Sequence, residues 1–118
     1  MSVFSGLHLP EVLVETSSQY SENIKVLKFG DVLKLSVNNF VQSLSKNSKS
    51  AAKLCWGETL NIIKEQTVEA PPQNILILGL GGGTMQHLIR EAFPKANMVS
   101  VEIDQVIVDL ARQYFDID

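Results

Sequence analysis

The sequence predicts an α/β fold in which a small N-terminal antiparallel β-sheet is followed by a βαβα unit with parallel strands. The first half of the chain carries short apolar stretches separated by turn residues, which is typical of antiparallel strands. The second half carries an uncharged apolar run at Asn74–Leu78, a glycine-rich turn and then apolar residues at helical spacing. The 118 residues suffice for one small domain or for a piece of a larger one. We predict an N-terminal β-strand domain over residues 1–50 and a partial α/β domain over residues 51–118.

Three strands are predicted in the first part, over Glu11–Thr16, Ile24–Phe29 and Val32–Val37. In the third of these strands apolar and polar residues alternate, as they do in a half-buried strand. The two residues between the second and third strands, Gly30-Asp31, suit a type II′ hairpin. Residues Ser2–Pro10 are predicted to be a loosely ordered lead-in.

The link to the second part is predicted to be an exposed loop over Ser43–Lys53, because serine, lysine and asparagine dominate it. A helix is predicted from Lys53 to Gln66, followed by a rigid, proline-containing connector over Thr67–Gln73. One face of this helix carries Trp56, Leu60 and Ile63. Two roles are open to Trp56, and packing the helix on the sheet is preferred over stacking on a ligand.

Two stretches with β-branched and other apolar residues, Asn74–Leu78 and Met98–Ile103, are predicted to be parallel strands buried on both faces. A helix is predicted between them over Thr84–Phe93, since apolar residues recur there at helical spacing and Pro94 stops the helix. A last amphipathic helix is predicted over Gln105–Phe115. Together these elements predict a βαβα unit with a right-handed crossover.

The turn after the first parallel strand carries Gly79, Gly81 and Gly83, which let the backbone bend sharply and let a ligand approach it closely. A dinucleotide site requires a further glycine where Thr84 stands, so this spacing is more typical of S-adenosylmethionine-type sites. Glu102 is predicted at the carboxyl end of the second strand, where a carboxylate can accept both hydrogen bonds of a ribose diol. The pattern therefore predicts a nucleoside half-site. The alternative is a tight turn with an incidental surface glutamate.

No catalytic residue and no metal ligand is predicted from the spacing of the polar residues. His8 and His87 have no partner at the spacing of a metal site or a catalytic triad. Asp104, two residues after Glu102, is predicted to cap the last helix rather than to contact a ligand.

Several motifs occur in a fixed order along the chain. They are Ser18-Gln19-Tyr20, Ile24-Lys25-Val26, Leu33-Lys34-Leu35, Gln42-Ser43, Ile-Leu-Ile-Leu-Gly-Leu-Gly-Gly-Gly-Thr at 75–84, Val-Glu-Ile-Asp at 101–104, and residues 106–115. This set resembles the spermidine/spermine synthase family of polyamine aminopropyltransferases, over roughly Glu15 to Phe115. The resemblance implies the Rossmann-like fold of S-adenosylmethionine-dependent methyltransferases, here truncated to the βαβα unit.

The resemblance also implies a ligand and its binding residues. The ligand is decarboxylated S-adenosylmethionine, S-adenosylmethionine or methylthioadenosine, bound weakly or not at all by this chain alone. Gly79, Gly81, Gly83 and Glu102 are the candidate binding residues, and Gln42 is either a ligand contact or a solvated loop amide. Because β domains of the family build oligomer contacts, a homodimer or larger homo-oligomer is expected.

Three positions depart from the family pattern. Gly82 stands where the family usually has an aspartate, and Gly57 stands where it has a histidine or similar polar residue. The family's catalytic aspartate lies on a later strand, beyond Asp118. The chain is therefore predicted to be an N-terminal fragment or a degenerate member of the family, without transferase activity on its own.

Two other readings are open. The chain can be a fragment of an S-adenosylmethionine-dependent methyltransferase, although Ile77 stands where such enzymes usually carry an acid. It can also be a non-catalytic dimerisation module without a ligand.

Composition excludes several classes of function. A net charge of −3 provides no basic surface for nucleic acid. Cys55 is the single cysteine, which excludes an internal disulfide and suits a reducing compartment. The first 13 residues have no basic, apolar signal pattern, and no apolar run is long enough to span a membrane. We therefore expect a soluble, cytoplasmic protein with no membrane or nucleic-acid partner.

Overall fold

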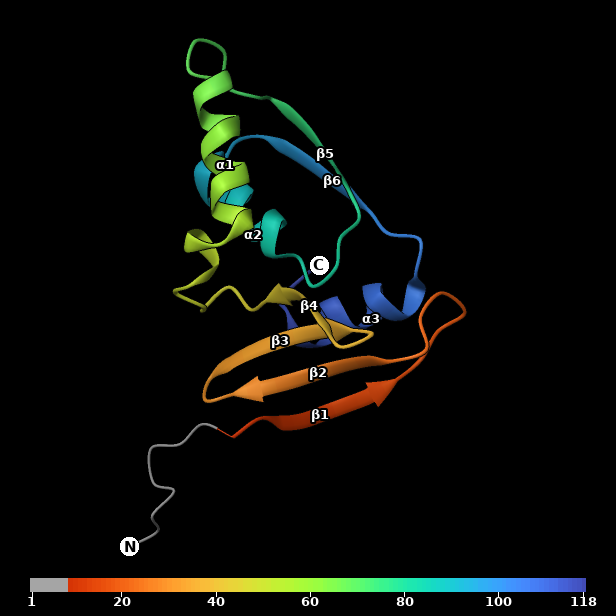
Figure 1. Ribbon diagram of the computed structural model, residues 1–118. Coiled ribbons are helices and arrows are strands. Elements are labelled where there is room, and N and C mark those ends of the chain that lie inside the picture. Colours follow the sequence, from red (N-terminus) through yellow and green to blue (C-terminus); the bar gives the residue numbers. More distant parts are fainter. Residues whose placement is uncertain (1–8) are drawn as a thin grey trace, which may run out of the picture.

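The computed structural model describes residues 9–118 and contains two β-sheets, three α-helices and one short 3₁₀ helix (Figure 1). The predicted α/β fold is confirmed: an antiparallel sheet comes first, and a strand–helix–strand–helix unit with parallel strands follows. His8 and all of the predicted lead-in except Leu9 and Pro10 lie outside the described residues.

The antiparallel sheet has the strand order β1-β2-β3-β4. Strands β1 (Glu11–Thr16), β2 (Ile24–Phe29) and β3 (Val32–Val37) have the predicted bounds. The hairpin between β2 and β3 pairs Phe29 with Val32, which leaves a two-residue turn in which Gly30 has a φ of +63°. This backbone conformation explains the glycine, since other residues rarely adopt it.

The fourth strand, β4 (Phe40–Leu44), was not predicted. Asn38 and Asn39 connect it to β3 with φ angles of +49° and +69°, and asparagine is one of the few residues that tolerate such angles in a tight hairpin. The prediction of an exposed loop from Ser43 to Lys53 is wrong at its start, because Ser43, Leu44 and Ser45 are buried. Ser45 is buried at low cost, since its hydroxyl accepts a hydrogen bond from the Leu33 amide at 2.9 Å.

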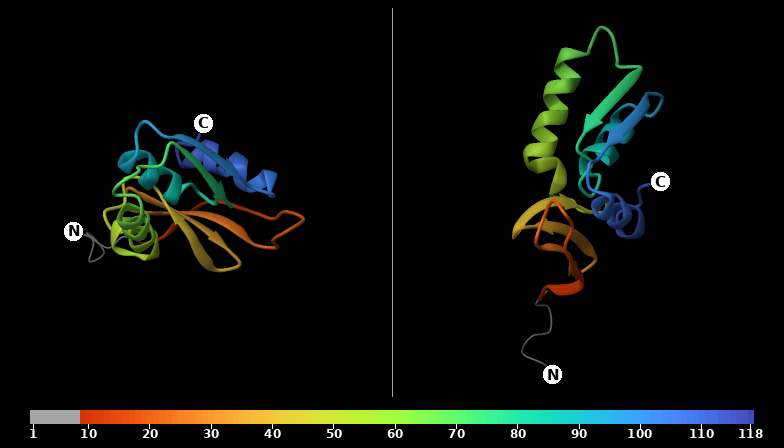
Figure 2. Two further views of the ribbon diagram at one scale, coloured as in Figure 1. Left: turned by 90° about the horizontal axis from the view of Figure 1, so that it is seen from above. Right: turned by 90° about the vertical axis from the view of Figure 1, so that its right-hand side faces the viewer.

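After the 3₁₀ helix η1 (Ala51–Lys53), helix α1 (Cys55–Gln66) contacts α2 (Thr84–Ala92), and α2 contacts β6. Figure 2 shows α1 and the parallel strands extending together away from the antiparallel sheet. The predicted inner face of α1 is confirmed, with Leu60 buried and Trp56 and Ile63 half-buried. No helix in residues 9–118 is long and apolar enough to cross a membrane.

The parallel sheet consists of β5 (Asn74–Leu78) and β6 (Asn97–Val101) in direct register. The prediction that both strands are buried on both faces is wrong. Alternate residues are half-buried, whereas the other face exposes Leu76 and its partner Val99 to 61% and 58%. Both strands have the apolar composition of strands that are buried on both faces, but within the described residues no element covers their second face.

Helix α3 (Gln105–Tyr114) packs against the antiparallel sheet (Figure 1). The largest cluster of buried side chains comprises Ile24, Val26, Leu35, Ile107, Leu110 and Phe115. This core therefore crosses the predicted boundary between residues 50 and 51. Asp104 caps α3 as predicted, because its carboxylate accepts a hydrogen bond from the Val106 amide at 3.0 Å.

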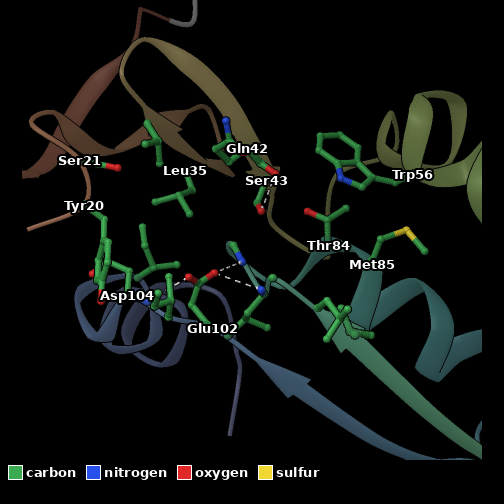
Figure 3. A pocket seen from close by; sticks show the side chains of 18 residues that line it. Tyr20, Ser21, Leu35, Gln42, Ser43, Trp56, Thr84, Met85, Glu102 and Asp104 are labelled. Atoms are coloured by element: carbon green, nitrogen blue, oxygen red, sulfur yellow. Dashed lines mark hydrogen bonds between the residues drawn. The ribbon is translucent and has the colours of Figure 1, made fainter. Parts of the chain in front are cut away.

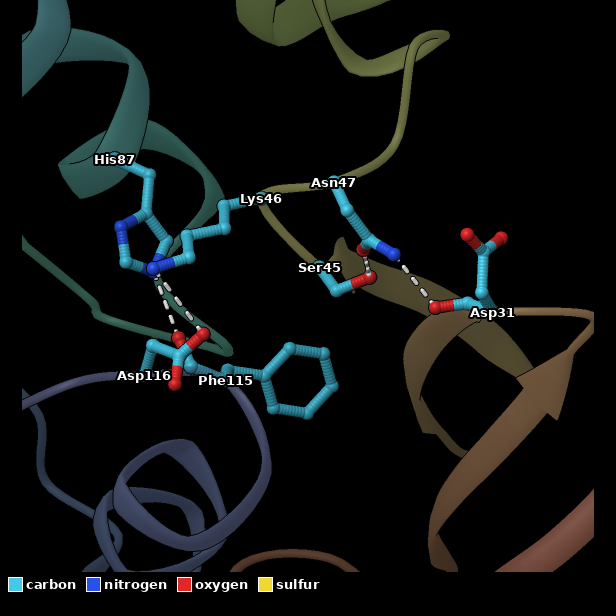
Figure 4. A network of polar contacts seen from close by, with 7 residues as sticks. All are labelled: Asp31, Ser45, Lys46, Asn47, His87, Phe115 and Asp116. Carbon is cyan, nitrogen blue, oxygen red and sulfur yellow. Dashed lines mark hydrogen bonds and ion pairs between the residues drawn. The ribbon is translucent and has the colours of Figure 1, made fainter.

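Polar contacts fasten the end of α3 to its surroundings (Figure 4). His87 on α2 donates from Nε2 to the Phe115 carbonyl oxygen at 2.7 Å, and Lys46 forms an ion pair with Asp116 at 3.3 Å. Asn47 donates to the Asp31 carbonyl oxygen at 2.6 Å, which holds the loop after β4 against the β2–β3 hairpin. His87 thus has a structural partner.

Candidate functional site

The glycine turn lies between β5 and α2, at the carboxyl end of β5. Gly79, Gly81 and Gly83 have φ angles of +87°, +55° and +87°, all of which favour glycine. Gly79 donates its amide to the Val101 carbonyl oxygen at 2.8 Å, so the start of the turn continues the pairing of the two strands. The sequence pattern therefore places three glycines where the backbone requires them.

Glu102 directly follows β6 and reaches across to this turn (Figure 3). Its Oε1 accepts hydrogen bonds from the amides of Leu80 at 3.1 Å and Gly81 at 3.3 Å. Its Oε2 accepts one from the amide of Asp104 at 3.1 Å. The carboxylate thus connects the ends of both parallel strands to the start of α3.

A cavity of about 490 Å³ opens between this edge of the parallel sheet and the antiparallel sheet (Figure 3). This volume falls in the range of about 300–1,000 Å³ that is typical of small-molecule sites. Four of the predicted binding residues line it: Gly79, Gly81, Glu102 and Gln42. Gln42 comes from β4, on the opposite wall from Glu102, so residues far apart in the sequence meet here.

Gly83 does not line this cavity. It precedes α2, and a Cβ atom at this position would lie 2.4 Å from Cδ1 of Ile117. The role of Gly83 is therefore to let the C-terminal residues pack against the turn.

Several other residues that line the cavity are not predicted from the sequence to do so. Trp56 and Asp104 were predicted to pack a helix and to cap one, and both also line the cavity. Tyr20, Ser43, Thr84 and Met85 also line the cavity. Tyr20 belongs to the Ser18-Gln19-Tyr20 motif, which was the available signal in the sequence.

The loop that carries Tyr20 is anchored to the site. The Ser18 hydroxyl donates to Oδ2 of Asp104 and accepts hydrogen bonds from the amides of Tyr20 and Ser21, each at 3.2 Å. Asp104 is 5% exposed, so this hydrogen bond is shielded from water. The β1–β2 loop therefore closes one side of the cavity in a defined position.

The two glycines that depart from the family pattern have a steric explanation. The Gly82 amide donates to the Ser43 hydroxyl at 2.7 Å, and a Cβ at residue 82 would lie 2.7 Å from Cβ of Ser43. A Cβ at residue 57 would lie 1.8 Å from the carbonyl oxygen of Ala52 in η1. Neither position can take an aspartate or a histidine without moving its neighbours.

The chain is similar in sequence to several known proteins. Over 93 residues the chain is 33% identical to a probable polyamine aminopropyl transferase of Bifidobacterium longum, a match covering 79% of this chain and 20% of that protein. Over 44 residues it is 46% identical to a polyamine aminopropyltransferase of Vibrio vulnificus, covering 37% of this chain and 15% of that protein. An eEF1A lysine and N-terminal methyltransferase homolog of Drosophila melanogaster is 36% identical over 55 residues, or 43% of this chain and 8% of that protein. No family model matches the chain.

The solved structures define the fold. A probable spermidine synthase from Corynebacterium glutamicum superposes with a TM-score of 0.69 at 21% identity, covering 92% of this chain and 41% of that one. The spermidine synthase from Thermotoga maritima gives a TM-score of 0.63 at 18% identity, covering 87% of this chain and 34% of that one.

Fold and site together define a protein with the spermidine synthase fold, in which a glycine turn and an acidic residue face a cavity. By sequence, the chain belongs to the polyamine aminopropyltransferase family and corresponds to the N-terminal part of those proteins. It spans about a fifth of the length of the Bifidobacterium relative.

Proposed function

We propose that the cavity binds an adenine nucleoside of the S-adenosylmethionine or methylthioadenosine type, as the nucleoside half-site of an aminopropyltransferase-like protein. The observation that carries this proposal is the position of Glu102. Its carboxylate stands at the carboxyl end of β6, beside the glycine turn at the carboxyl end of β5, and faces the cavity. The carboxyl ends of parallel strands are where such folds bind nucleosides.

In this proposal, residues on each wall of the cavity contact a different part of the nucleoside. Glu102 accepts hydrogen bonds from the ribose diol, since its Oε2 has one protein partner and retains acceptor capacity. Gly79 and Gly81 let the nucleoside approach the backbone, and the Gln42 amide offers a donor and an acceptor from the opposite wall. Trp56, Met85 and Ile107 supply apolar surface for the flat base.

We further propose that residues 9–118 do not transfer an aminopropyl group by themselves. The attacking amine must lose its proton to gain a lone pair, and this step needs a base. The two carboxylates that line the cavity already have partners: Glu102 accepts three backbone amides, and Asp104 accepts from Val106 and Ser18. In the proposed complex the remaining acceptor capacity of Glu102 is used by the ribose diol, so neither carboxylate is assigned the role of the base.

Calorimetry with methylthioadenosine tests the binding proposal. Glu102→Ala is expected to lower the affinity by about tenfold or more, because it removes a charged acceptor of the ribose. Gln42→Ala is expected to weaken binding by a smaller factor without disturbing the turn. Glu69→Ala is the matched control, since Glu69 is exposed and lies outside the cavity lining. Equal heats for the wild type and both cavity variants would contradict the proposal.

Incubation of the purified chain with putrescine and decarboxylated S-adenosylmethionine tests the second part. We expect no spermidine. Turnover that persists through rigorous purification would show that a base has been overlooked.

A methyltransferase parent is a second candidate, favoured by one observation. The matches to eEF1A lysine and N-terminal methyltransferases include mouse and human proteins at 39% identity over 44 residues. Competition between S-adenosylmethionine and its decarboxylated form separates the two candidates. Tighter binding of the carboxylated ligand favours the methyltransferase, and tighter binding of the decarboxylated ligand favours the aminopropyltransferase. A cytoplasmic location remains a prediction in both cases.

A further inference from the structure

A second cavity, of about 770 Å³, lies between the loop after β4, the 3₁₀ helix η1 and helix α2. Its volume falls within the range of about 300–1,000 Å³ that is typical of small-molecule sites. Among the described residues, Thr84 alone lines both this cavity and the one proposed to bind a nucleoside. The second cavity is therefore a separate site, and the proposed function gives it no role.

The second cavity is lined mainly by positive charge. Lys46 and Lys49 come from the loop after β4, and Arg90 comes from the last turn of α2. Glu91 is the single carboxylate among the described residues that line it. The chain as a whole carries a net charge of −3, so this concentration of cations is local. A cavity with such a lining attracts anions.

The three cations retain donors for a ligand. Arg90 uses Nη1 to donate to the carbonyl oxygens of Ala96 at 2.7 Å and Pro94 at 3.2 Å, which leaves the hydrogens of Nη2 and Nε. The Lys46 side chain pairs with Asp116 at 3.3 Å, but both side chains are more than half exposed, so the pair is weak (Figure 4). Lys49 forms no ion pair within residues 9–118.

Hydrogen bonds hold the floor of the cavity and the loop that carries the two lysines. Thr84 accepts a hydrogen bond from the Leu44 amide at 2.9 Å and donates to the Leu44 carbonyl oxygen at 3.0 Å, and both residues are 4% exposed. The Ser45 amide donates to the Leu33 carbonyl oxygen at 2.8 Å, and the Ser48 amide donates to the Ser45 carbonyl oxygen at 2.9 Å. The loop backbone is therefore ordered before a ligand arrives, which lowers the entropic cost of binding.

We propose that this cavity binds a small molecule with two or more phosphate groups. Lys46 and Lys49 hold one phosphate from the loop, and the Arg90 guanidinium binds another through two parallel hydrogen bonds. More than one phosphate is needed because the cations lie on two separate elements along the cavity. This site does not depend on the proposed nucleoside site.

Calorimetry of the full chain with inorganic pyrophosphate, at about 50 mM salt and without divalent cations, tests the proposal. Pyrophosphate is expected to bind with a stoichiometry of one and several-fold more tightly than inorganic phosphate. Lys46→Gln/Lys49→Gln should lower its affinity about tenfold or more, because two charges are lost from the site. Lys28→Gln/Lys64→Gln is the matched control, since it removes two charges at exposed positions outside the cavity lining. This control should change the affinity less than about twofold.

Equal losses for the two double variants would mean that pyrophosphate responds only to net charge, and would overturn the proposal. Absence of binding by the wild type would do the same. Arg90→Lys keeps the charge but loses the planar fork, and should weaken pyrophosphate binding several-fold. The affinity for methylthioadenosine should be unchanged in Lys46→Gln/Lys49→Gln, so the failure of either site can be recognised separately.

A second measurement uses the wild type alone. In amide NMR spectra, pyrophosphate is expected to shift the signals of residues 45–49 and 87–91, which line the second cavity. Signals of the glycine turn, residues 79–83, should move less. Shifts that centre on the glycine turn, or that spread evenly over all lysine-bearing segments, would overturn the proposed site.

Discussion

The antiparallel sheet and the pair of parallel strands differ in how much of their apolar surface is buried. In the first region, α3 covers one face of the sheet, and Ile24, Val26 and Leu35 are fully buried beneath it. In the second region, α2 contacts β6 on one side, while Leu76, Leu78, Val99 and Val101 on the other side remain between 47% and 76% exposed. A parallel sheet normally has helices on both faces.

This difference arises because elements that follow one another in the sequence do not always pack together. Helix α3 follows β6 in the sequence, yet its buried face belongs to the N-terminal core. The first region is therefore stabilised by α3, whereas within residues 9–118 no element covers the second face of the parallel pair. The candidate site lies where the two regions meet, so its geometry depends on the well-packed region holding the other in place.

The largest expected effect comes from the core that joins the regions. Phe115 is 1% exposed and belongs to the same buried cluster as Ile24 and Leu35. Phe115→Ala should lower the free energy of unfolding by about 3–5 kcal/mol, because it leaves a cavity in this core. Phe40→Ala is the matched control, since Phe40 is 72% exposed, and should cost less than about 1 kcal/mol. Urea titration of both variants measures the difference, and similar costs would contradict the proposed core.

A substitution in the second region, where α1 approaches η1, is expected to lower the free energy of unfolding by a smaller amount. Gly57→Ala would place a Cβ 1.8 Å from the Ala52 carbonyl oxygen, so the backbone must shift. We expect a loss of about 1–3 kcal/mol in the free energy of unfolding, typical of an overpacked position. Thr59→Ala on the exposed side of the same helix serves as control. An unchanged denaturation midpoint for Gly57→Ala would show that α1 does not approach η1 this closely.

Substitutions at the contact between Asp104 and Ser18 should lower the free energy of unfolding by a still smaller amount. Asp104→Ala removes the cap of α3 and the acceptor of the Ser18 hydroxyl, and should cost about 1–2 kcal/mol. Ser18→Ala removes only the second contact, at about 0.5–1.5 kcal/mol. Thermal unfolding followed by circular dichroism ranks the two variants. A larger loss for Ser18→Ala than for Asp104→Ala would contradict the capping role.

Much of the fold could be predicted from the sequence, because its strongest signals are local. The bounds of β1, β2, β3 and β5 follow from short apolar runs between turn residues, and the glycine turn follows from its spacing. The sequence does not predict β4 because Ser43 and Ser45, in and just after this strand, are typical of a loop. Both are buried, and their hydroxyls accept hydrogen bonds from the amides of Gly82 and Leu33. The Asn38-Asn39 turn was a signal for this hairpin.

The candidate site could be predicted only in part. Gly79, Gly81, Glu102 and Gln42 line one cavity, but the sequence did not indicate that Glu102 already accepts three backbone amides. Such contacts depend on the distance between two strand ends, which no local pattern specifies. Trp56 and Asp104 show a further limit, since one side chain can both support an element and face a cavity.

Substitutions on the exposed face of β5 and β6 are expected to change the stability of the monomer least. They also test most directly whether this face differs from the covered face of the antiparallel sheet. We propose that this face mediates association into a homodimer or larger oligomer, because Leu76 and Val99 are adjacent in register and together expose a continuous apolar surface. Strands β5 and β6 also pair only with each other among the described residues, so each has a free edge.

The double variant Leu76→Glu/Val99→Glu should remove this association. Each glutamate lies at an exposed position, so the free energy of unfolding of the monomer should change by only about 0.5 kcal/mol per site. Charges facing each other across the interface would however oppose pairing of two copies. Ile62→Glu, at a 59% exposed position on α1, controls for the added charge. Light scattering over a micromolar dilution series is expected to show oligomers for the wild type and Ile62→Glu and monomers for the double variant. A wild type that stays monomeric throughout, or a double variant that keeps the oligomer mass, would mean that the exposed face does not pair between copies.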